Sequence, residues 1–444
     1  MTTANRFLDG QEKAYLRIAM PAAMEGVFMI LLSSVDLIMV GTLGTAAIAA
    51  VSIFTQPRMM ILCVTRSMAS AVTLLTAQLF GMGRAGETGS LLKQSLLLGA
   101  IVLGVLHGIF YWQLEAILLW MGAEPAYLGE AMVYGEIALG AVFLTSLATI
   151  LQAGMMGFGR TGAVMEINVW GNVINILVNA LLIFGLGPFP ALGVKGAAIG
   201  TVTGALYTMM VTLRWLRREG VLCRGTYLPG RDYFRQFLPV FGGVFSEQGC
   251  ERIGMVLYTR MAAELGTIPY AVHAICMNFC DFYYCFAGGM GKASMVLAGQ
   301  ALGRGSREEW QRHLRSGLRW SFLFSTISFA LTFLLREEIF AIYSTDAEAM
   351  ALGSVIMIFV AAVSFPEAHA MICAGALRGS GKTTQVAAYS FLSITILRPI
   401  VTGIFLYHFH MGLAGAWLAL AIDQTIRAAC SSFLLRRVWK RGAD

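Results

Sequence analysis

SLLLGAIVLGVLHGIFYW (residues 95–112) and WSFLFSTISFALTFLL (320–335) contain no aspartate, glutamate, lysine or arginine, and stretches of this kind decide the fold. A hydrocarbon core about 30 Å thick is crossed by roughly 20 apolar residues of α-helix. The whole chain has the same character, because 57% of its 444 residues are hydrophobic and 13% are charged. Such a chain has too little polar surface to be coated by water, so we expect it to use lipid as part of its solvent.

Long apolar stretches recur along the whole chain. Counting them predicts an all-α integral membrane protein with twelve transmembrane helices. The predicted spans are 14–40, 46–80, 92–112, 130–156, 163–186, 191–214, 234–259, 269–302, 317–335, 350–377, 384–408 and 412–436.

Basic residues gather in alternate connecting segments. The segments after the even-numbered spans are rich in arginine, whereas the opposite segments are acidic or nearly neutral. This bias predicts a multi-pass protein of the cell membrane with both termini in the cytoplasm. The formal net charge of +7 therefore reflects orientation, and no nucleic-acid partner is expected. The two most basic segments hold Arg214, Arg217, Arg218, Arg224, Arg231 and Arg235, and Arg304, Arg307, Arg312, Arg315 and Arg319.

The second half of the chain repeats the first at an offset of 222 residues, which is half of 444. AQLFGMGR (77–84) aligns with GQALGRGS (299–306), and GFGRT (157–161) aligns with GSGKT (379–383). The repeat predicts two pseudo-symmetric six-helix bundles. Their expected bounds are an N-terminal lobe at 1–214, a cytoplasmic linker at 215–233 and a C-terminal lobe at 234–444. Transporters use parallel repeats of this kind to rock two lobes about a central site.

GSGKTT (379–384) has the look of a phosphate-binding loop but does not fit the pattern. The loop requires glycine five residues before Gly381, where this chain has Ala376, and it should follow a strand. No paired histidine and acid motif and no nucleophile with its base is found elsewhere. We therefore expect no enzyme activity and no cofactor, and we expect transport to run on a proton or sodium gradient.

Acidic side chains lie where lipid should surround the first span. An ionisable group at mid-membrane depth costs roughly 2.5–3.5 kcal/mol on insertion scales, so such groups usually face a cavity, form pairs or carry ions. Asp36 lies in LLSSVDLIMVG, and Glu25 precedes it by eleven residues. Eleven residues return to within about 20° of the same helical face. Both carboxylates are therefore expected to line one cavity wall.

The fifth span carries a stripe of amides at Asn168, Asn172, Asn175 and Asn179, spaced four, three and four residues apart. This spacing places them on one helical face. The stripe either joins helices or, together with Asp36, supplies oxygen ligands. Apart from this possible sodium site at Asp36, Asn175 and Asn179, the sequence indicates no metal site.

The second half has its own acids, Glu247, Glu251 and Glu367. Glu247 and Glu251 follow Pro239, and Glu367 follows Pro366, and prolines let helices bend. Glu247 and Glu367 are predicted to couple ions. Glu251 is expected either to pair with the neighbouring Arg252 or to line the substrate cavity.

Three further residues are assigned to the substrate cavity. Arg398 in ILRPIV is predicted to be buried and to need a carboxylate partner, with Glu367 or Glu251 the expected ones. Asp281 and Tyr284, in NFCDFYYC, are expected to line the cavity of the second lobe.

These features together resemble the multidrug and toxic compound extrusion family over essentially the whole chain. The resemblance rests on PAAMEGVFMILLSSVDLIMVGTLGTAAIAAV (21–51), the repeated turns after Gln78 and Gln300, Glu247 eight residues after Pro239, and EAHAMICAGALRGSGKTT (367–384). It implies a twelve-helix antiporter with two lobes around a central cleft, which exchanges cationic compounds for inward-moving sodium or protons.

The resemblance also implies roles for single residues. By motif position, Asp36 is similar to the family's acid on the first span, and Asn175 to its partner on the fifth. Glu247 and Glu367 are similar to the acids of the seventh and tenth spans. One branch of the family has aspartate where this chain has Asn179. This difference argues against a proton site in the first lobe alone and favours the acids of the second lobe as the coupling residues.

The sequence thus predicts an antiporter that exports cationic and amphiphilic organic compounds by alternating access. Its expected partners are small-molecule cations and membrane lipid, and a monomer is expected. A flippase for a lipid-linked precursor is the alternative. Such a protein needs cationic groups in its cavity to bind phosphates, and Arg398 is a candidate for such a group.

Overall fold

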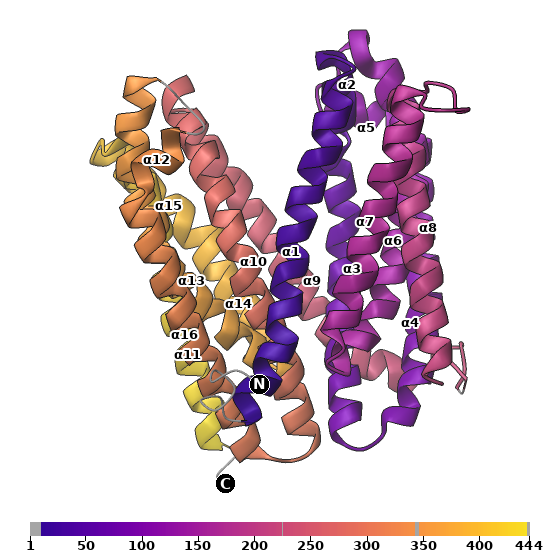
Figure 1. Ribbon diagram of the computed structural model, residues 1–444. Helices are drawn as coiled ribbons and strands as arrows, with labels where there is room; N and C mark the ends of the chain where they lie inside the picture. Colours follow the sequence, from indigo (N-terminus) through magenta and orange to yellow (C-terminus); the bar gives the residue numbers. More distant parts are fainter. Residues whose placement is uncertain (1–9, 224, 342–345, 442–444) are drawn as a thin grey trace, which may run out of the picture. The chain divides into compact units, whose positions relative to one another are not determined.

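The computed structural model describes residues 10–223, 225–341 and 346–441, and within them every regular element is a helix (Figure 1). The predicted cytoplasmic termini lie mostly outside these residues. The helices are α1 (Gly10–Gly41), α2 (Thr45–Ile53), α3 (Thr55–Gly81), η2 (Ala85–Glu87), α4 (Thr88–Trp112), α5 (Leu114–Trp120), α6 (Pro125–Gly157), α7 (Thr161–Phe184), α8 (Val194–Arg218), α9 (Arg231–Ala263), α10 (Thr267–Gly303), α11 (Arg307–Leu334), α12 (Arg336–Ala341), α13 (Ala347–Gly379), α14 (Thr383–Ser390), η3 (Phe391–Leu397), α15 (Arg398–Gly403), η4 (Ile404–His408) and α16 (Gly412–Arg441).

Ten helical segments of the described chain are long and apolar enough to cross a membrane. The predicted spans 234–259 and 269–302 coincide with α9 and α10, which are long helices but are not among these ten. Charged and polar side chains, such as Glu247 and Arg252 on α9 and Asp281 on α10, lower the hydropathy of both helices. The all-helical membrane fold is confirmed, and the count of twelve spans stays a prediction.

The helix bounds repeat at the offset found in the sequence. The central helices α6 (Pro125–Gly157) and α13 (Ala347–Gly379) begin and end 222 residues apart, and so do the starts of α7 and α14. The turns that follow α6 and α13 contain Gly159 and Gly381 with φ of 78° and 76°. Only glycine adopts such positive φ angles without strain. The repeated glycine motifs therefore mark equivalent helix ends.

One compact unit comprises Val27–Phe241 and has α6 at its centre. Helix α6 contacts α2, α3, α4, α5, α7 and α8. Glycines allow this close packing, because a Cβ built on Gly157 would lie 2.5 Å from the Thr76 side chain and one built on Gly154 would lie 2.8 Å from Leu92. Small residues let membrane helices approach in the absence of a hydrophobic driving force between them.

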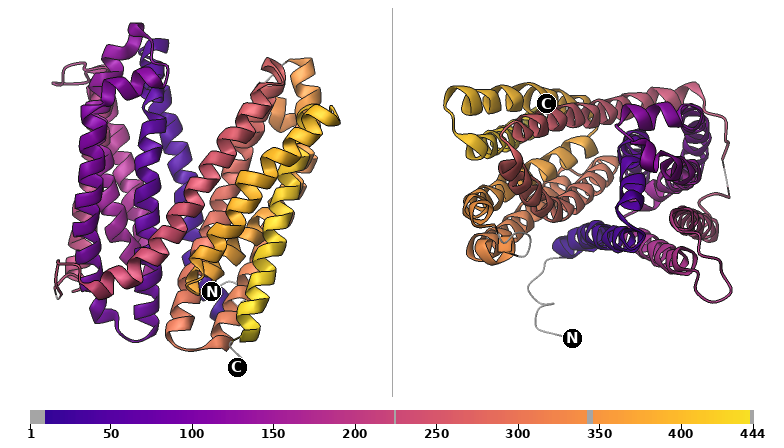
Figure 2. Two further views of the ribbon diagram at one scale, coloured as in Figure 1. Left: turned by 180° about the vertical axis from the view of Figure 1, so that it is seen from behind. Right: turned by 90° about the horizontal axis from the view of Figure 1, so that it is seen from above.

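The other compact unit contains α1 up to Gly26 and the chain from Gly242 onward, with α13 at its centre. Helix α13 contacts α10, α11, α12, α14 and α16. The first part of α1 is anchored here by Tyr15, whose hydroxyl donates to the Met290 carbonyl at 2.8 Å and contacts Ser294 Oγ at 2.9 Å. Tyr15 is fully buried. Figure 2 gives two further views of these helices.

Helices α1 and α9 are each divided between the two units, at Gly26 and at Phe241. The boundary in α1 follows Pro21, and the boundary in α9 follows Pro239. The compact units therefore differ from the predicted lobes 1–214 and 234–444 by the exchange of these two helix ends, and the predicted lobes and linker remain predictions.

The segment before α9 and the first turn of α9 are held on α4. Lys93 Nζ donates to the Gly225 carbonyl at 3.2 Å, and Tyr233 OH contacts Ser95 Oγ at 2.9 Å. Part of the predicted linker thus belongs to the unit Val27–Phe241.

The span Thr383–His408 contains two π-helical segments, η3 and η4. Pro399 lies just after η3 and has no N–H to continue the α-helical ladder. Wider turns of this kind arise where that ladder is interrupted and are frequent at functional sites. Arg398, the first residue of α15, lies at this irregularity.

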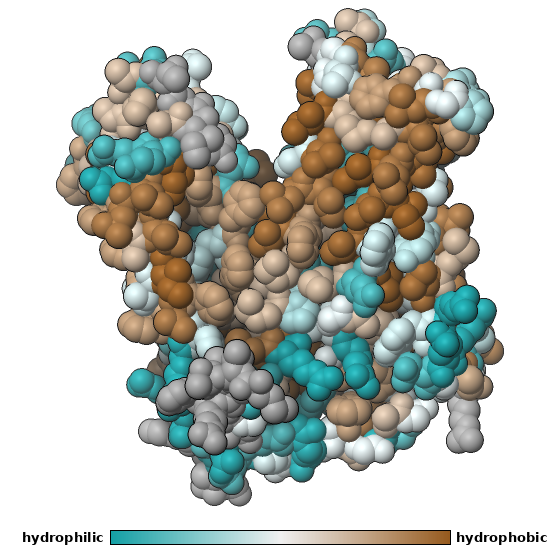
Figure 3. All heavy atoms as spheres, in the orientation of Figure 1, coloured by the Kyte–Doolittle hydropathy of each residue, from teal (hydrophilic) through white to brown (hydrophobic). Residues whose placement is uncertain are grey.

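Apolar residues cover much of the length of the helices within each unit, and hydrophilic residues gather at the helix ends (Figure 3). This distribution is typical of helices whose middle parts contact lipid.

Candidate functional site

Asp36, Asn175 and Asn179 lie together in the unit Val27–Phe241. Asn179 Nδ2 on α7 donates to Asp36 Oδ1 on α1 at 3.0 Å and lies 3.4 Å from Asn175 Oδ1. Asn175 Nδ2 donates in turn to Thr201 Oγ1 on α8 at 3.2 Å. Both asparagines are buried, and Asp36 is partly buried. Three helices thus converge on one connected polar cluster, Asp36, Asn175, Asn179 and Thr201, which we call the Asp36 cluster.

Glycines on α8 shape the space around this cluster. Gly196, Gly200 and Gly204 are spaced four residues apart, so they lie along one face of the helix. A Cβ built on Gly200 would lie 1.9 Å from Asn179 Oδ1. Any larger residue at 200 would therefore displace the amide that holds Asp36.

The Asp36 cluster is rich in oxygen and contains an unsatisfied acceptor. Asn179 Oδ1 is buried without a hydrogen-bond partner among the described residues. A buried polar atom without a partner is costly and needs an explanation. Carboxylate, amide and hydroxyl oxygens are the ligands that hard cations prefer, and the carboxylate of Asp36 can also take up a proton. No basic side chain of the described chain forms an ion pair with Asp36.

The remaining amides of the stripe have other partners. Asn168 and Gln152 on α6 form two hydrogen bonds of 2.8 and 3.2 Å, which join α7 to α6. Asn172 Nδ2 donates to the Asn168 carbonyl at 2.8 Å and lies 3.1 Å from Met29 Sδ. The four amides therefore divide into Asn168 and Asn172, which have other partners, and Asn175 and Asn179, which belong to the Asp36 cluster.

Glu247 on α9 forms a bidentate ion pair with Arg378 on α13. Arg378 Nη2 lies 2.5 Å from Glu247 Oε1, and Arg378 Nε lies 3.0 Å from Oε2. The side chain of Glu247 is 2% exposed. Bidentate pairing of this kind fixes both side chains and neutralises the carboxylate. Glu247 was predicted to couple ions, and the structure places it in a pair that the sequence did not predict.

Glu251 has a partner from α16, not its neighbour in sequence. Arg427 Nη2 lies 3.1 Å from Glu251 Oε1, so the expected pairing with Arg252 is wrong. Glu247 and Glu251 are one helical turn apart on α9, and they pair with different arginines, Arg378 and Arg427.

Arg398 is buried as predicted, but its partner is Asp423 on α16 and not Glu367 or Glu251. Arg398 Nε and Nη2 lie 3.0 and 2.5 Å from Asp423 Oδ2. The Arg398 side chain is 3% exposed and that of Asp423 is 0% exposed. Ser393 Oγ also donates to Asp423 Oδ1. This pair lies beside the π-helical segment η3 and carries no net charge.

Glu367 on α13 is partly buried and forms no ion pair within 4.0 Å among the described residues. It follows Pro366, and a pocket of about 340 Å³ adjoins this proline, lined in part by Ser321, Ser325 and His369. Unlike Glu247, Glu251 and Asp423, Glu367 thus has no arginine within ion-pair distance in the described chain.

The other predicted cavity residues are less constrained. Asp281 and Tyr284 on α10 are exposed, and Glu25 on α1 is partly buried. No described hydrogen bond joins Asp281 or Tyr284 to Glu251 or Glu367. Asp36 and Glu25 lie on one continuous helix but in different compact units. The roles of these residues stay predictions.

Sequence reasoning missed Thr201, Arg378, Asp423 and Arg427 as site residues. A signal for the charged ones was present, because LALAIDQTIRAAC (418–430) carries Asp423 and Arg427 inside an apolar span. Charges in such a span need partners, so these two residues were candidates by the same rule that selected Arg398. The described residues contain no group of three His, Cys, Asp or Glu side chains that could hold a metal.

Many long apolar helices, together with buried acids and amides inside them, define a multi-pass membrane transport protein. The MatE family model matches residues 21–181 and 244–404, one match in each half of the chain. The chain therefore belongs to the MatE family, which confirms the resemblance to the multidrug and toxic compound extrusion transporters.

Several curated relatives are similar over nearly the whole chain. A probable multidrug resistance protein NorM of Thermotoga maritima is 24% identical over 97% of this chain and 94% of its own length. The multidrug resistance protein PmpM of Pseudomonas aeruginosa is 28% identical over 83% of this chain and 78% of its own length.

Solved structures show the same fold. A MATE family transporter in an outward-facing conformation superposes with a TM-score of 0.87 at 20% identity, covering 99% of this chain and 98% of the other. A MATE structure in a bent conformation gives a TM-score of 0.89 at 19% identity and covers 100% of both chains.

Proposed function

We propose that this protein exports cationic and amphiphilic organic compounds across the plasma membrane, in exchange for inward-moving protons or sodium. The named multidrug resistance functions of NorM and PmpM support this substrate class. In this proposal twelve helices cross the membrane, with α9 and α10 as the seventh and eighth spans. Both termini lie in the cytoplasm, and a monomer performs the cycle without a cofactor or an enzymatic step.

The observation that carries the proposal is the partial burial of the Asp36 carboxylate without a cationic partner in the described chain. Its carboxylate is partly buried, is held by Asn179 at 3.0 Å, and has no cationic partner in the described chain. The buried acids Glu247 and Asp423, in contrast, each have an arginine. An unpaired carboxylate at membrane depth is unfavourable unless it binds a cation or a proton.

The mechanism that follows is competition for carboxylates. Asp36 in one unit and Glu367 in the other each attract cationic groups of a substrate, and a proton or sodium ion that arrives from outside neutralises or occupies each carboxylate. The affinity for substrate then falls and release is favoured. By linkage, the ion weakens substrate binding by the same factor by which the substrate weakens ion binding.

The alternative function, a lipid-precursor flippase, rested on a free cationic group at Arg398, and the structure does not support it. Arg398 was the candidate phosphate-binding cation, and its guanidinium is already bound to Asp423. A neutral ion pair has little attraction for a phosphate, so we do not carry the flippase further.

The test is transport of a fluorescent cationic dye in proteoliposomes, with a proton gradient or a sodium gradient imposed separately. Asp36→Asn is expected to abolish gradient-driven dye movement while keeping the fold, because an amide fits the same hydrogen bond to Asn179 but cannot take up a proton. Glu130→Gln, which removes the same charge from an exposed position on α6, is the matched control and should transport as wild type. Unchanged coupling in Asp36→Asn would overturn the proposed role of Asp36, and no dye movement by folded wild type under either gradient would overturn the function.

A further inference from the structure

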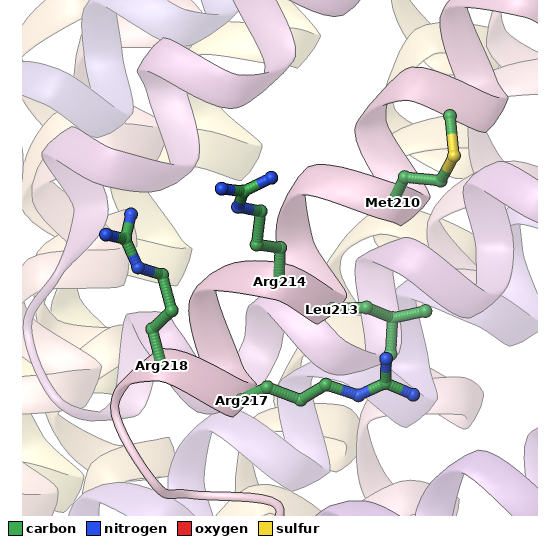
Figure 4. A pocket seen from close by; sticks show the side chains of 5 residues that line it. All are labelled: Met210, Leu213, Arg214, Arg217 and Arg218. Carbon is green, nitrogen blue, oxygen red and sulfur yellow. The ribbon is translucent and has the colours of Figure 1, made fainter.

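The C-terminal end of α8 carries an arginine-lined pocket that the transport mechanism does not use. The pocket has a volume of about 540 Å³ and is lined by Met210, Leu213, Arg214, Arg217 and Arg218 (Figure 4). At 100° per residue these side chains lie within an arc of about 140° on one side of the helix. One face of α8 therefore changes from apolar to strongly basic within its last two turns.

The three arginines of this pocket are exposed and have no carboxylate partner among the described residues. This sets them apart from Arg84 and Arg304, which lie just after the ends of α3 and α10. Arg84 lies 2.6 Å from Glu87, and Arg304 lies 2.6 Å from Glu309. Orientation in the membrane needs basic residues but does not need them unpaired and adjacent. Three neighbouring guanidinium groups without counter-charges make a site that is complementary to an anion.

The apolar part of the same face continues into the membrane span. Leu206 and Met210 are 43% and 54% exposed, and they precede Arg214 and Arg218 at four-residue spacing. The candidate membrane span Val194–Arg218 ends at the last of these arginines. Lipid tails lie beside the apolar part of such a span, and headgroups lie at its ends. The apolar stripe and the basic pocket thus match the two parts of one phospholipid.

The corresponding helix of the second half lacks this combination. Gly193, which precedes α8, and Gly412, the first residue of α16, have the same φ of 56°, so the two helices can be compared from these glycines. Counted in this way, Thr425 and Ala429 stand in the place of Leu206 and Met210, and Phe433 stands in the place of Arg214. Arg437 at the end of α16 lies over the Phe433 ring, 4.5 Å from its centroid. Arg436 and Arg437 thus stand in the place of Arg217 and Arg218, whereas no apolar stripe leads to them and Phe433 takes the place of Arg214.

We propose that the end of α8 binds an anionic phospholipid of the surrounding leaflet. Arg214, Arg217 and Arg218 hold its phosphate and anionic headgroup, and an acyl chain lies along Leu206 and Met210. Basic residues close to a membrane surface attract anionic lipid, and arginine binds phosphate through two parallel hydrogen bonds. This site is separate from the Asp36 cluster and does not depend on the proposed transport function.

The test is native mass spectrometry of the purified full-length protein, titrated in detergent with phosphatidylglycerol or with phosphatidylcholine. Wild type is expected to retain phosphatidylglycerol in preference to phosphatidylcholine. Arg214→Gln/Arg218→Gln is expected to weaken phosphatidylglycerol retention by roughly 25-fold, since each arginine near an anionic surface contributes about fivefold. The matched control is Arg436→Gln/Arg437→Gln, which removes two exposed arginines from the end of α16 and should weaken retention by less than about twofold.

Two further arms make the outcome decisive. Arg214→Lys/Arg218→Lys keeps both charges and is expected to recover part of the retention. Inorganic phosphate at the same concentration should not displace the lipid, because it cannot occupy the apolar stripe. Equal losses in the α8 and α16 variants would overturn the proposal, as would unchanged lipid retention in the α8 variant. Full displacement by inorganic phosphate would overturn it too, by indicating a site for soluble anions.

Discussion

Replacing Asp423 with asparagine is expected to destabilise the unit that contains α13 and α16. The structure places Asp423 and Arg398 at 0% and 3% side-chain exposure, with Arg398 Nε and Nη2 at 3.0 and 2.5 Å from Asp423 Oδ2. Asparagine keeps an acceptor for Ser393 but leaves the guanidinium buried without a counter-charge. Breaking a buried pair on one side costs about 3–5 kcal/mol, or roughly 10²- to 10⁴-fold in the unfolding equilibrium.

The assay is thermal unfolding followed by a thiol-reactive dye, since Cys276 and Cys373 are buried and free. Asp423→Asn should lower the apparent transition temperature by at least about 5 °C. Adding Arg398→Met removes the unpaired charge and should recover most of that loss. Glu308→Gln, which breaks an exposed pair with Arg312, should leave the transition unchanged. A double variant no more stable than Asp423→Asn alone would refute the reasoning.

Contacts within each compact unit lead to two further predictions. Gly200→Ala should abolish gradient-driven dye transport while the protein stays folded, because the added Cβ would meet Asn179 Oδ1 at 1.9 Å. The control is Gly104→Ala, where an added Cβ meets nothing within 4 Å. Equal transport by the two variants would contradict this prediction. Glu247→Gln and Arg378→Gln should each lower the thermal transition by similar amounts, since each breaks the same pair of 2.5 Å, and a large loss in one variant alone would show that the two side chains do not act together.

The sequence predicted the membrane fold because the signal is thermodynamic and local. Every backbone polar group inside lipid must be satisfied within its own helix, so apolar runs of sufficient length become helices regardless of their neighbours. The repeat was equally visible, since the paired glycine turns at Gly159 and Gly381 require positive φ and keep their spacing of 222 residues. Spans rich in polar residues, such as α9 and α10, gave the weaker signal.

The sequence predicted which residues would form polar sites, but it did not predict which of them would pair with one another. Asp36, Asn175 and Asn179 were found because helical spacing and the cost of burying a carboxylate restrict which residues can share a polar cluster. Arg398 was expected to be buried and paired, yet its partner Asp423 lies on α16, in a span whose charges had not been assigned. Periodicity orders residues around one helix but says nothing about which helix packs against it.

The sequence by itself determined that the protein lies in lipid, that its spans are helices, and that the second half of the chain repeats the first. It also identified the charged and polar residues inside apolar spans that need partners or a function. What only the tertiary structure decided is which charges cancel. Glu247 pairs with Arg378 and Glu251 with Arg427, while Asp36 accepts a hydrogen bond from Asn179 and Glu367 forms no ion pair among the described residues. The reason is physical, because the free energy of a buried charge depends on atoms within a few ångströms, and these come from helices far apart in the chain.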